Sequence, residues 1–156
     1  MTKLISAPNS DFLLQEHPVN MHMETTEWLS DFEFCKTELA FLTNLLKKVF
    51  LNANNKRKIS EATLLEKKVK LFSEKTLKAL HDSVIEHEQH LASLDENAFA
   101  QDASVIKKEH EKKKFSVKAF MGSVKKIKKE VFDFFEVQMK QTKNIIKEFE
   151  EGSMSL

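Results

Sequence analysis

Histidine is the residue type whose spacing in this sequence most directly suggests chemistry. Three of the six histidines lie within ten residues, in the stretch HDSVIEHEQH at 81–90. Imidazole binds transition metals and changes its charge near neutral pH, so this stretch could hold a metal ion or respond to protons. On a helix, His87 and His90 are about 60° apart, whereas His81 points about 120° away from His87. Only His87 and His90 are therefore expected to act together.

A zinc site here would need three or four ligands that converge on one point. The helix arrangement predicted below brings residues from other segments close to this stretch, and the candidate metal ligands are His87, His90, His110 and Glu24. Known motifs do not support the site, because no glutamate lies three residues before these histidines and HEQH lacks the His-Glu-x-x-His spacing. No cofactor is predicted. Zinc binding and a pH-responsive cluster are the alternatives to histidines that only hydrogen-bond or stack near Trp28.

The other residues offer little catalytic chemistry. Cys35 falls on an apolar helix stripe, where a thiol usually acts as a small, unreactive hydrophobe. The two glycines of the chain, Gly122 and Gly152, cannot form a glycine-rich phosphate loop. The sequence therefore predicts a protein that is not an enzyme.

The elements that must position these residues are expected to be helices. Apolar residues make up 41% and charged residues 31% of the 156 residues, with only two glycines and two prolines. This composition suits long amphipathic helices and lacks the turn residues of a sheet. Apolar residues recur at alternating spacings of three and four in three segments, which is the heptad pattern of packed helices. In the first segment these positions are Trp28, Phe32, Cys35, Leu39, Leu42, Leu46 and Val49.

The second and third segments each carry a histidine within the same heptad pattern. The second begins near Ser60, and its apolar stripe shifts by about one residue near Thr76 before it continues through His87. The stripe of the third segment includes His110. Turns are predicted at 52–58, where asparagines tolerate the left-handed backbone conformation, and at 95–97.

Short connections between long helices favour antiparallel neighbours. The predicted fold is all-α: an elongated, up-down-up antiparallel three-helix bundle with coiled-coil-like packing and a long third helix. Residues 1–19 are expected to form a flexible leader, 20–150 a single bundle domain with its first helix at about 21–53, and 151–156 a disordered tail. Aligning the helices about the two turns places His87 near Glu24 and puts His110 within about one turn of His87.

Lysine is concentrated in the third segment, with ten lysines against three glutamates at 107–130. Such a run could bind nucleic acid or an anionic membrane. The run has no arginine, however, and the segment expected beside it is acidic between Glu24 and Glu38. Charge pairing within the bundle is the simpler interpretation. Polyanion binding is therefore the third functional hypothesis, and nucleic acid is not a predicted partner.

The third segment is predicted to outlast its neighbours. The alignment leaves Phe135 to about Phe149 without a partner helix, a length of about 20 Å. The candidate interaction residues there are Phe135, Ile145, Ile146 and Phe149. Apolar residues on an unpartnered helix need another surface, so the predicted function is a non-enzymatic interaction or scaffold protein that forms a homo-oligomer or binds another protein. The alternative is a third helix that bends near Gly122 or after Phe135 and folds back.

The stretch EWLSDFEFCKTELAFLTNLL at 27–46, with the histidine-containing helix after it, resembles small uncharacterised all-helical proteins of Bacteroidota over about residues 24–94. The resemblance implies a stand-alone cytoplasmic bundle with no assigned activity. The single cysteine favours the same location. The first fifteen residues lack a signal-peptide pattern, and no run approaches the roughly 18 apolar residues that span a bilayer. We therefore expect a cytoplasmic protein without a transmembrane segment.

Overall fold

The computed structural model describes residues 18–52, 55–96 and 100–154. These residues are helical almost throughout and contain no strand, which confirms the predicted all-α class. The elements are α2 (Pro18–Asn52), α3 (Lys56–Leu71), the π-helical segment η1 (Phe72–Leu77), α4 (Lys78–Glu96) and α5 (Ala100–Met154). Because η1 joins α3 to α4 without interruption, these elements form three long helical rods.

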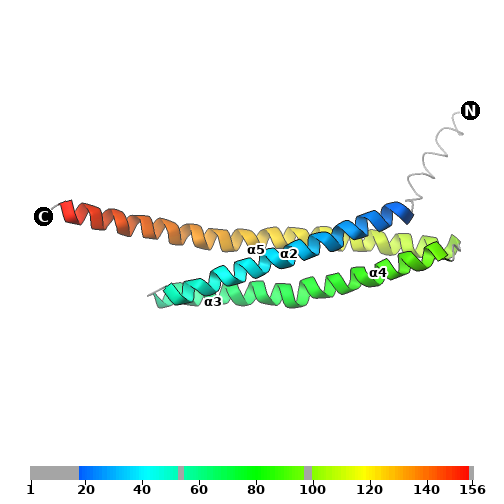
Figure 1. Cartoon of the computed structure of the whole chain (residues 1–156), viewed down its shortest axis with the longest axis horizontal. Coiled ribbons are helices and arrows are strands. Elements are labelled where there is room, and N and C mark those ends of the chain that lie inside the picture. Colours follow the sequence, from blue (N-terminus) through cyan, green and yellow to red (C-terminus); the bar gives the residue numbers. More distant parts are fainter. Residues whose placement is uncertain (1–17, 53–54, 97–99, 155–156) are drawn as a thin grey trace, which may run out of the picture.

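The three rods lie side by side over much of their length (Figure 1). α2 and α5 run in one direction, and α3, η1 and α4 return in the opposite direction (Figure 1). α2 contacts α3, α4 and α5, and α4 also contacts α5. α5 continues beyond the C-terminal end of α2 and the N-terminal end of α3, so its own C-terminal end projects alone (Figure 1).

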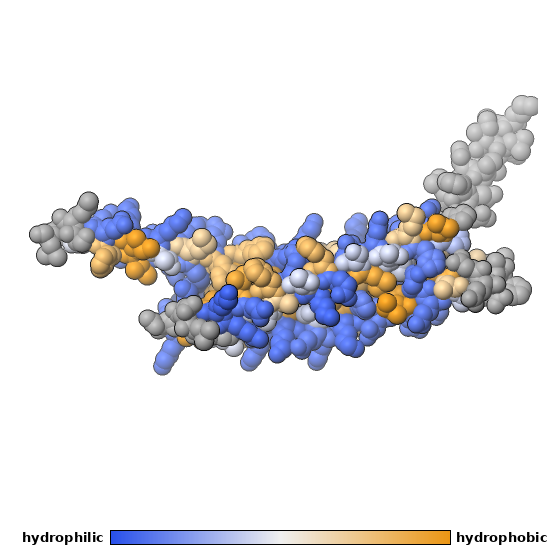
Figure 2. All heavy atoms as spheres, in the orientation of Figure 1, coloured by the Kyte–Doolittle hydropathy of each residue, from blue (hydrophilic) through white to orange (hydrophobic). Residues whose placement is uncertain are grey.

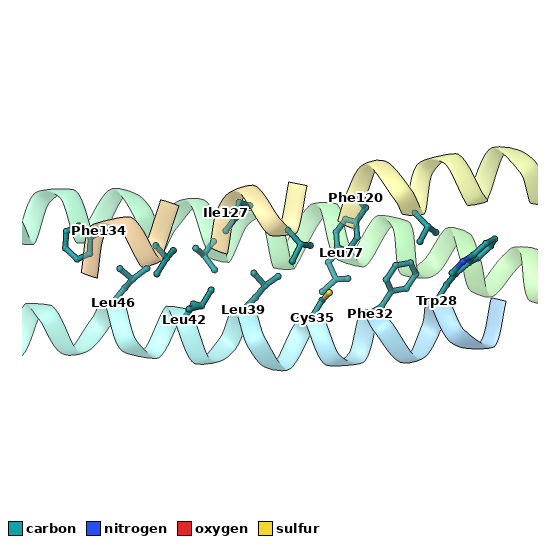
Figure 3. Packing of buried hydrophobic residues seen from close by; sticks show 14 of the residues in the cluster. Trp28, Phe32, Cys35, Leu39, Leu42, Leu46, Leu77, Phe120, Ile127 and Phe134 are labelled. Carbon is teal, nitrogen blue, oxygen red and sulfur yellow. The ribbon is translucent and has the colours of Figure 1, made fainter. Parts of the chain in front are cut away.

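The core forms where the apolar stripes of the three rods meet. The predicted α2 positions from Trp28 to Leu46 are all buried, and Val49 packs against the same cluster. Figure 3 shows the α2 side chains from Trp28 to Leu46 facing residues of the other two rods, among them Leu77, Phe120, Ile127 and Phe134. Burying each large apolar side chain contributes about 1.5–3 kcal/mol, so this cluster supplies most of the stability of the fold.

A π-helical turn accommodates the irregular spacing of the second rod. Val69, Phe72 and Leu77 all pack in the core, but Phe72 and Leu77 are five residues apart instead of the three or four of a heptad pattern. The π-helical segment spans these same residues, and a π turn holds one residue more than an α turn. The stripe shift that the sequence predicts near Thr76 is therefore confirmed, and its cause is this widened turn.

α5 is longer and more regular than the sequence suggests. It is one helix from Ala100 to Met154, so it neither breaks at Gly122 nor folds back after Phe135. The disordered tail predicted at 151–156 is wrong for residues 151–154, which continue the helix. Residues 155 and 156 lie outside the described residues.

Two predicted helix starts also change. α3 begins at Lys56, four residues before Ser60, because the Asn55 side chain caps it by accepting a hydrogen bond from the Arg57 backbone N–H at 2.9 Å. Asn55 has an extended backbone with φ −102°, not the left-handed conformation expected of a turn asparagine. α2 begins at Pro18, inside the predicted leader. Residues 1–17, 53–54 and 97–99, which hold the rest of the leader and parts of both turns, lie outside the described residues.

Candidate functional site

Two buried histidines form the centre of the candidate site. His87 on α4 and His110 on α5 are both 0% exposed, and His87 Nε2 lies 2.9 Å from His110 Nδ1. Both occupy heptad positions, so the helical period that buries Val84 and Leu91 also turns His87 toward the other rods. The His110 ring stacks on Trp28 of α2, with the ring centroids 4.9 Å apart. All three rods therefore contribute to the surroundings of the pair.

Glu109 on α5 joins both histidines of α4. Its Oε1 lies 3.0 Å from His87 Nδ1 and 2.9 Å from His90 Nδ1. An ionised carboxylate only accepts hydrogen bonds, so the Nδ1 atom of each histidine carries a proton and donates it. Burial on its own would raise the pKa of Glu109, but the hydrogen bonds from His90 and His87 outweigh burial and lower that pKa. Glu109 is thus the charged anchor of the network.

The direction of the remaining hydrogen bonds follows from Glu109. When the His87 ring carries one proton, on the Nδ1 atom that faces Glu109, its Nε2 atom can only accept, so His110 donates to it through Nδ1. Neutral His110 then carries no proton on Nε2, and this buried atom has no hydrogen-bond partner among the described residues. Glu24 of α2 faces it, with Oε2 3.4 Å away. One proton added at Nε2 would therefore extend the network from Glu109 to Glu24.

Burial opposes that additional proton. The pKa of His110 lies below its ordinary value of 6.5, because burial lowers it and the neighbouring His87 lowers it further, against the opposing effect of Glu24. Lys114 also lies near Glu24, with its Nζ 3.5 Å from Oε2, and reduces the negative charge that His110 meets. His110 is therefore neutral at pH 7, and the network is one proton short of full hydrogen bonding.

The structure brings the four predicted metal ligands into one network. His87 contacts His110, His90 shares Glu109 with His87, and Glu24 faces His110. However, both ring nitrogens of His87 are engaged in hydrogen bonds, one with Glu109 and one with His110. In residues 18–52, 55–96 and 100–154, no group of three or more His, Cys, Asp or Glu side chains is arranged to hold a metal ion. The geometry of this network therefore fits protons better than a metal.

Two other described histidines have partners outside this network. The His81 Nε2 atom is 3.8 Å from Glu33 Oε1, which agrees with the prediction that His81 does not act with His87. His22 of α2 contacts Glu88 of α4. His17 lies outside the described residues. Among the described histidines, the buried group is therefore one pair, His87 with His110, to which His90 is attached through Glu109.

Glu109 is the important residue that the sequence interpretation misses. It belongs to the lysine-rich run at 107–130, where an acidic residue suggests a solvated helix face. The signal that identifies it is its position directly before His110. A residue next to a heptad position lies about 100° around the helix, at the edge of the packed face, where its side chain can reach the neighbouring rod.

Acidification is expected to destabilise the fold through His110. Because burial lowers the pKa of folded His110, the unfolded chain binds this proton first as the pH falls below 6.5. The contribution of neutral His110 to the free energy of unfolding is complete above pH 6.5 and is lost as the pH falls toward the pKa of His110 in the folded protein. The free energy of unfolding should fall by up to about 1.4 kcal/mol per pH unit for this proton. The lowered pKa of Glu109 adds a further loss below 4.5. Urea denaturation at a series of pH values measures both losses.

His110→Asn is the matched test of this assignment. The asparagine amide can donate in place of Nδ1 but does not titrate, so most of the stability loss between neutral pH and pH 5.5 should disappear. His81→Asn, outside the network, should keep the wild-type dependence. Trp28 fluorescence gives a second readout, because its ring stacks on His110. An unchanged pH dependence in the His110 variant would contradict the assignment.

A second candidate surface is the free end of α5, which we define as residues 139–154. All its described side chains, from Met139 to Gly152, are exposed. The exposed fractions are 65% for Ile145, 52% for Ile146 and 77% for Phe149. Figure 2 shows apolar atoms along this projecting helix. Phe135 differs, because it is partly buried and packs against the core, so its assignment to the unpartnered segment is wrong.

Part of the lysine-rich run pairs with the acidic stretch of α2. Lys128 Nζ lies 2.9 Å from Glu38 Oε2, and Lys114 Nζ lies 3.5 Å from Glu24 Oε2. Both contacts join α5 to α2, as charge pairing within the bundle predicts. These lysines are therefore less suited to binding an external polyanion.

Comparison of the chain with known protein families, with curated proteins and with solved structures finds no match. The resemblance to helical proteins of Bacteroidota therefore stays a prediction. None of the helices in the part of the chain that the structure describes is long and apolar enough to cross a bilayer. The geometry of the histidine network and of the free end of α5 is thus the basis for the functional proposals below.

Proposed function

We propose that the protein is a non-enzymatic interaction protein that self-associates through the free end of α5. In this proposal α2, the rod from α3 to α4, and α5 form an up-down-up three-helix bundle with coiled-coil-like packing. The bundle is the rigid base, and the free end of α5 supplies the contact. The single cysteine of the chain favours action in the reducing cytoplasm.

The observation that supports the proposal is the apolar, exposed stripe on the free end. Ile145 and Phe149 lie within about 40° of each other around the helix and continue the line of Phe134, which packs in the core. Fully burying such side chains contributes about 1.5–3 kcal/mol each. A helix that packs along the free end therefore lowers the free energy, while a monomer leaves the stripe in water.

Replacing Ile145 and Phe149 by serine is expected to abolish self-association. Light scattering coupled to size-exclusion chromatography should show a mass above that of the 156-residue chain for the wild type, falling on dilution, and the monomer mass for the double variant. The matched control replaces Val105 and Phe115 by serine, since these residues are 64% and 76% exposed on the same helix but lie outside the free end. A wild-type protein that stays monomeric at all concentrations, or a double variant that associates equally well, would contradict the proposal.

A second proposed function is a pH-responsive element built on His87 and His110. It is supported by the unpartnered Nε2 atom of His110, which faces Glu24 within a fully buried pair. The pH titration of His110→Asn described above tests it. Zinc binding has less support because the histidine nitrogens bond to one another and to Glu109. Polyanion binding has less support because Lys114 and Lys128 pair with α2.

A further inference from the structure

We propose that a pocket between α2 and the π turn binds a small organic cation, a molecule that carries one ammonium group on an aromatic body. The pocket has a volume of about 440 Å³. Ligand pockets in proteins measure about 300–1,000 Å³, so this one is large enough for a small molecule. Every residue that lines it belongs to α2, η1 or α4. The inference is therefore independent of self-association through the free end of α5.

The π turn forms part of the wall of the pocket. Ser73, Glu74 and Leu77 of η1 all line it, and α2 and the first turns of α4 supply the remaining residues. The additional residue of a π turn shifts the side chains after it around the helix axis, and such turns occur frequently at functional sites. The irregular turn and the pocket thus coincide, as a binding role for this part of the rod predicts.

Two apolar side chains form the floor of the pocket. Phe32 of α2 is 1% exposed and Leu77 is 4% exposed, and both line the pocket. Figure 3 shows Phe32 pointing from α2 toward the other two rods, where Leu77 lies. The ring of His81, which also lines the pocket, meets the Phe32 ring edge to face with the centroids 6.2 Å apart. Aromatic rings attract each other beyond the area that they bury, so the floor favours an aromatic ligand body.

The charged side chains around this floor carry one negative charge in excess. Three carboxylates, those of Glu33, Glu74 and Asp82, line the pocket together with two ammonium groups, those of Lys36 and Lys78. Lys78 Nζ lies 3.3 Å from Asp82 Oδ2, so these two charges balance within α4. Glu33, Glu74 and Lys36 remain, with a net charge of one negative unit. A ligand with one positive charge therefore balances the pocket better than a neutral or an anionic ligand.

Glu33 and Glu74 are the carboxylates that we expect to attract the ammonium group. The Glu33 Oε1 atom lies 3.8 Å from His81 Nε2, beyond hydrogen-bonding distance, so it can accept a hydrogen bond from a ligand. Both glutamates are exposed, and solvent and salt screen exposed charges. Binding should therefore be weak, with a dissociation constant on the order of 1 mM for a ligand of about nine non-hydrogen atoms, and should weaken with added salt.

Two-dimensional NMR of the full-length protein tests the site with three probes that share a phenyl ring: 2-phenylethylammonium, 2-phenylethanol and 3-phenylpropanoate. At pH 7.5 an imidazole of ordinary pKa is mostly uncharged, so the charge of the pocket is set by the lysines and carboxylates. The ammonium probe should shift the backbone amide signals of Phe32, Glu33 and Leu77 until they saturate. It should bind about three- to fivefold more tightly than either other probe, the gain expected of ion pairs at exposed sites.

Glutamine at both glutamate positions tests the source of this preference. The variant Glu33→Gln with Glu74→Gln keeps the size of both side chains, so the ammonium probe should bind it no more tightly than 2-phenylethanol does. The matched control, Glu27→Gln with Glu86→Gln, removes two exposed charges outside the pocket and should bind like the wild type. Ser73→Phe places a ring in the pocket and should weaken all three probes. Thermal unfolding identifies any variant whose loss of binding reflects a loss of fold.

The results that would overturn the proposal are distinct. Equal affinity for the three probes, or unchanged ammonium binding in the double glutamine variant, would overturn the assignment of a cation. Amide signals of the pocket that do not shift far above the expected dissociation constant, or shifts confined to other parts of the chain, would overturn the pocket as a binding site. Self-association is measured separately by light scattering, and neither result changes it.

Discussion

Deletion of Lys75 is expected to leave the protein close to wild-type stability, whereas deletion of Glu86 is expected to unfold it. Both residues are exposed and charged, and both lie on the rod that returns between α2 and α5. They differ in their position relative to the π turn. Lys75 lies inside η1, where the helix already holds one residue more than an α-helix needs, and Glu86 lies in regular α4.

The reason is the heptad pattern on either side of each site. Deleting Lys75 brings Phe72 and Leu77 to a spacing of four, which a regular α-helix accommodates without rotating the flanking stripes. Deleting Glu86 instead turns the last helical turns by about 100° relative to the first ones. His87, Leu91 and Leu94 could then no longer be buried together with Val84. Burial of the two leucines alone contributes about 3–6 kcal/mol to the free energy of unfolding, which is comparable to the total stability of a small domain.

Thermal unfolding followed by circular dichroism measures the effect of both deletions. The Lys75 deletion should melt within a few degrees of the wild type, and the Glu86 deletion should show no cooperative transition. An equal loss of thermal stability in the two variants would mean that the π turn is not the site of the additional residue.

Replacing Glu109 by alanine is expected to lower the free energy of unfolding by about 2–3 kcal/mol, because a buried donor without a partner costs about 1–3 kcal/mol. The change removes the hydrogen-bond acceptor of His87 Nδ1, and the His87 side chain is fully buried. It also removes the acceptor of His90 Nδ1. Urea denaturation at pH 7.5 measures the loss. Glutamine at this position keeps one acceptor oxygen and should give an intermediate value.

Glu111→Ala is the matched control for this variant. It removes the same charge from the same helix two residues away, but its side chain is exposed. A surface substitution of this kind usually changes the free energy of unfolding by less than about 0.5 kcal/mol. If the two alanine variants lose the same stability, the loss reflects net charge or helix propensity, and Glu109 is not the anchor of the histidine network.

The heptad positions are the part of the fold that the sequence predicts well. Trp28 to Leu46 on α2, and Val117 to Phe134 on α5, are buried at the expected spacings, because burial on a helix follows the position of each residue around the helix axis. Irregular spacing was also informative, since the step from Phe72 to Leu77 located the π turn. The pattern could not show that α5 stays helical to Met154, because exposed residues carry no signal of burial.

The candidate site was predictable only in part. The heptad pattern places His87 and His110 in the core, and the alignment of the helices brings Glu24 near them. Both predictions need only the position of a residue around its helix axis and its approximate position along that axis. The role of Glu109 depends instead on which way a flanking side chain reaches and on which tautomers the hydrogen bonds select. Those depend on distances of a few tenths of an ångström between rods, which a one-dimensional pattern does not contain.

The histidine pair also fixes how far the rods can slide along one another. Apolar layers resemble each other, so a helix displaced by one heptad would still bury apolar side chains. The same displacement of α5 would bring Ala103 or Val117 to the place of His110, and neither side chain has a donor for His87 Nε2. The pair therefore specifies the register between α4 and α5. Since a slip of one heptad would lengthen or shorten the projecting helix by about 10 Å, a hydrogen bond at one end of the molecule sets the reach of the other end.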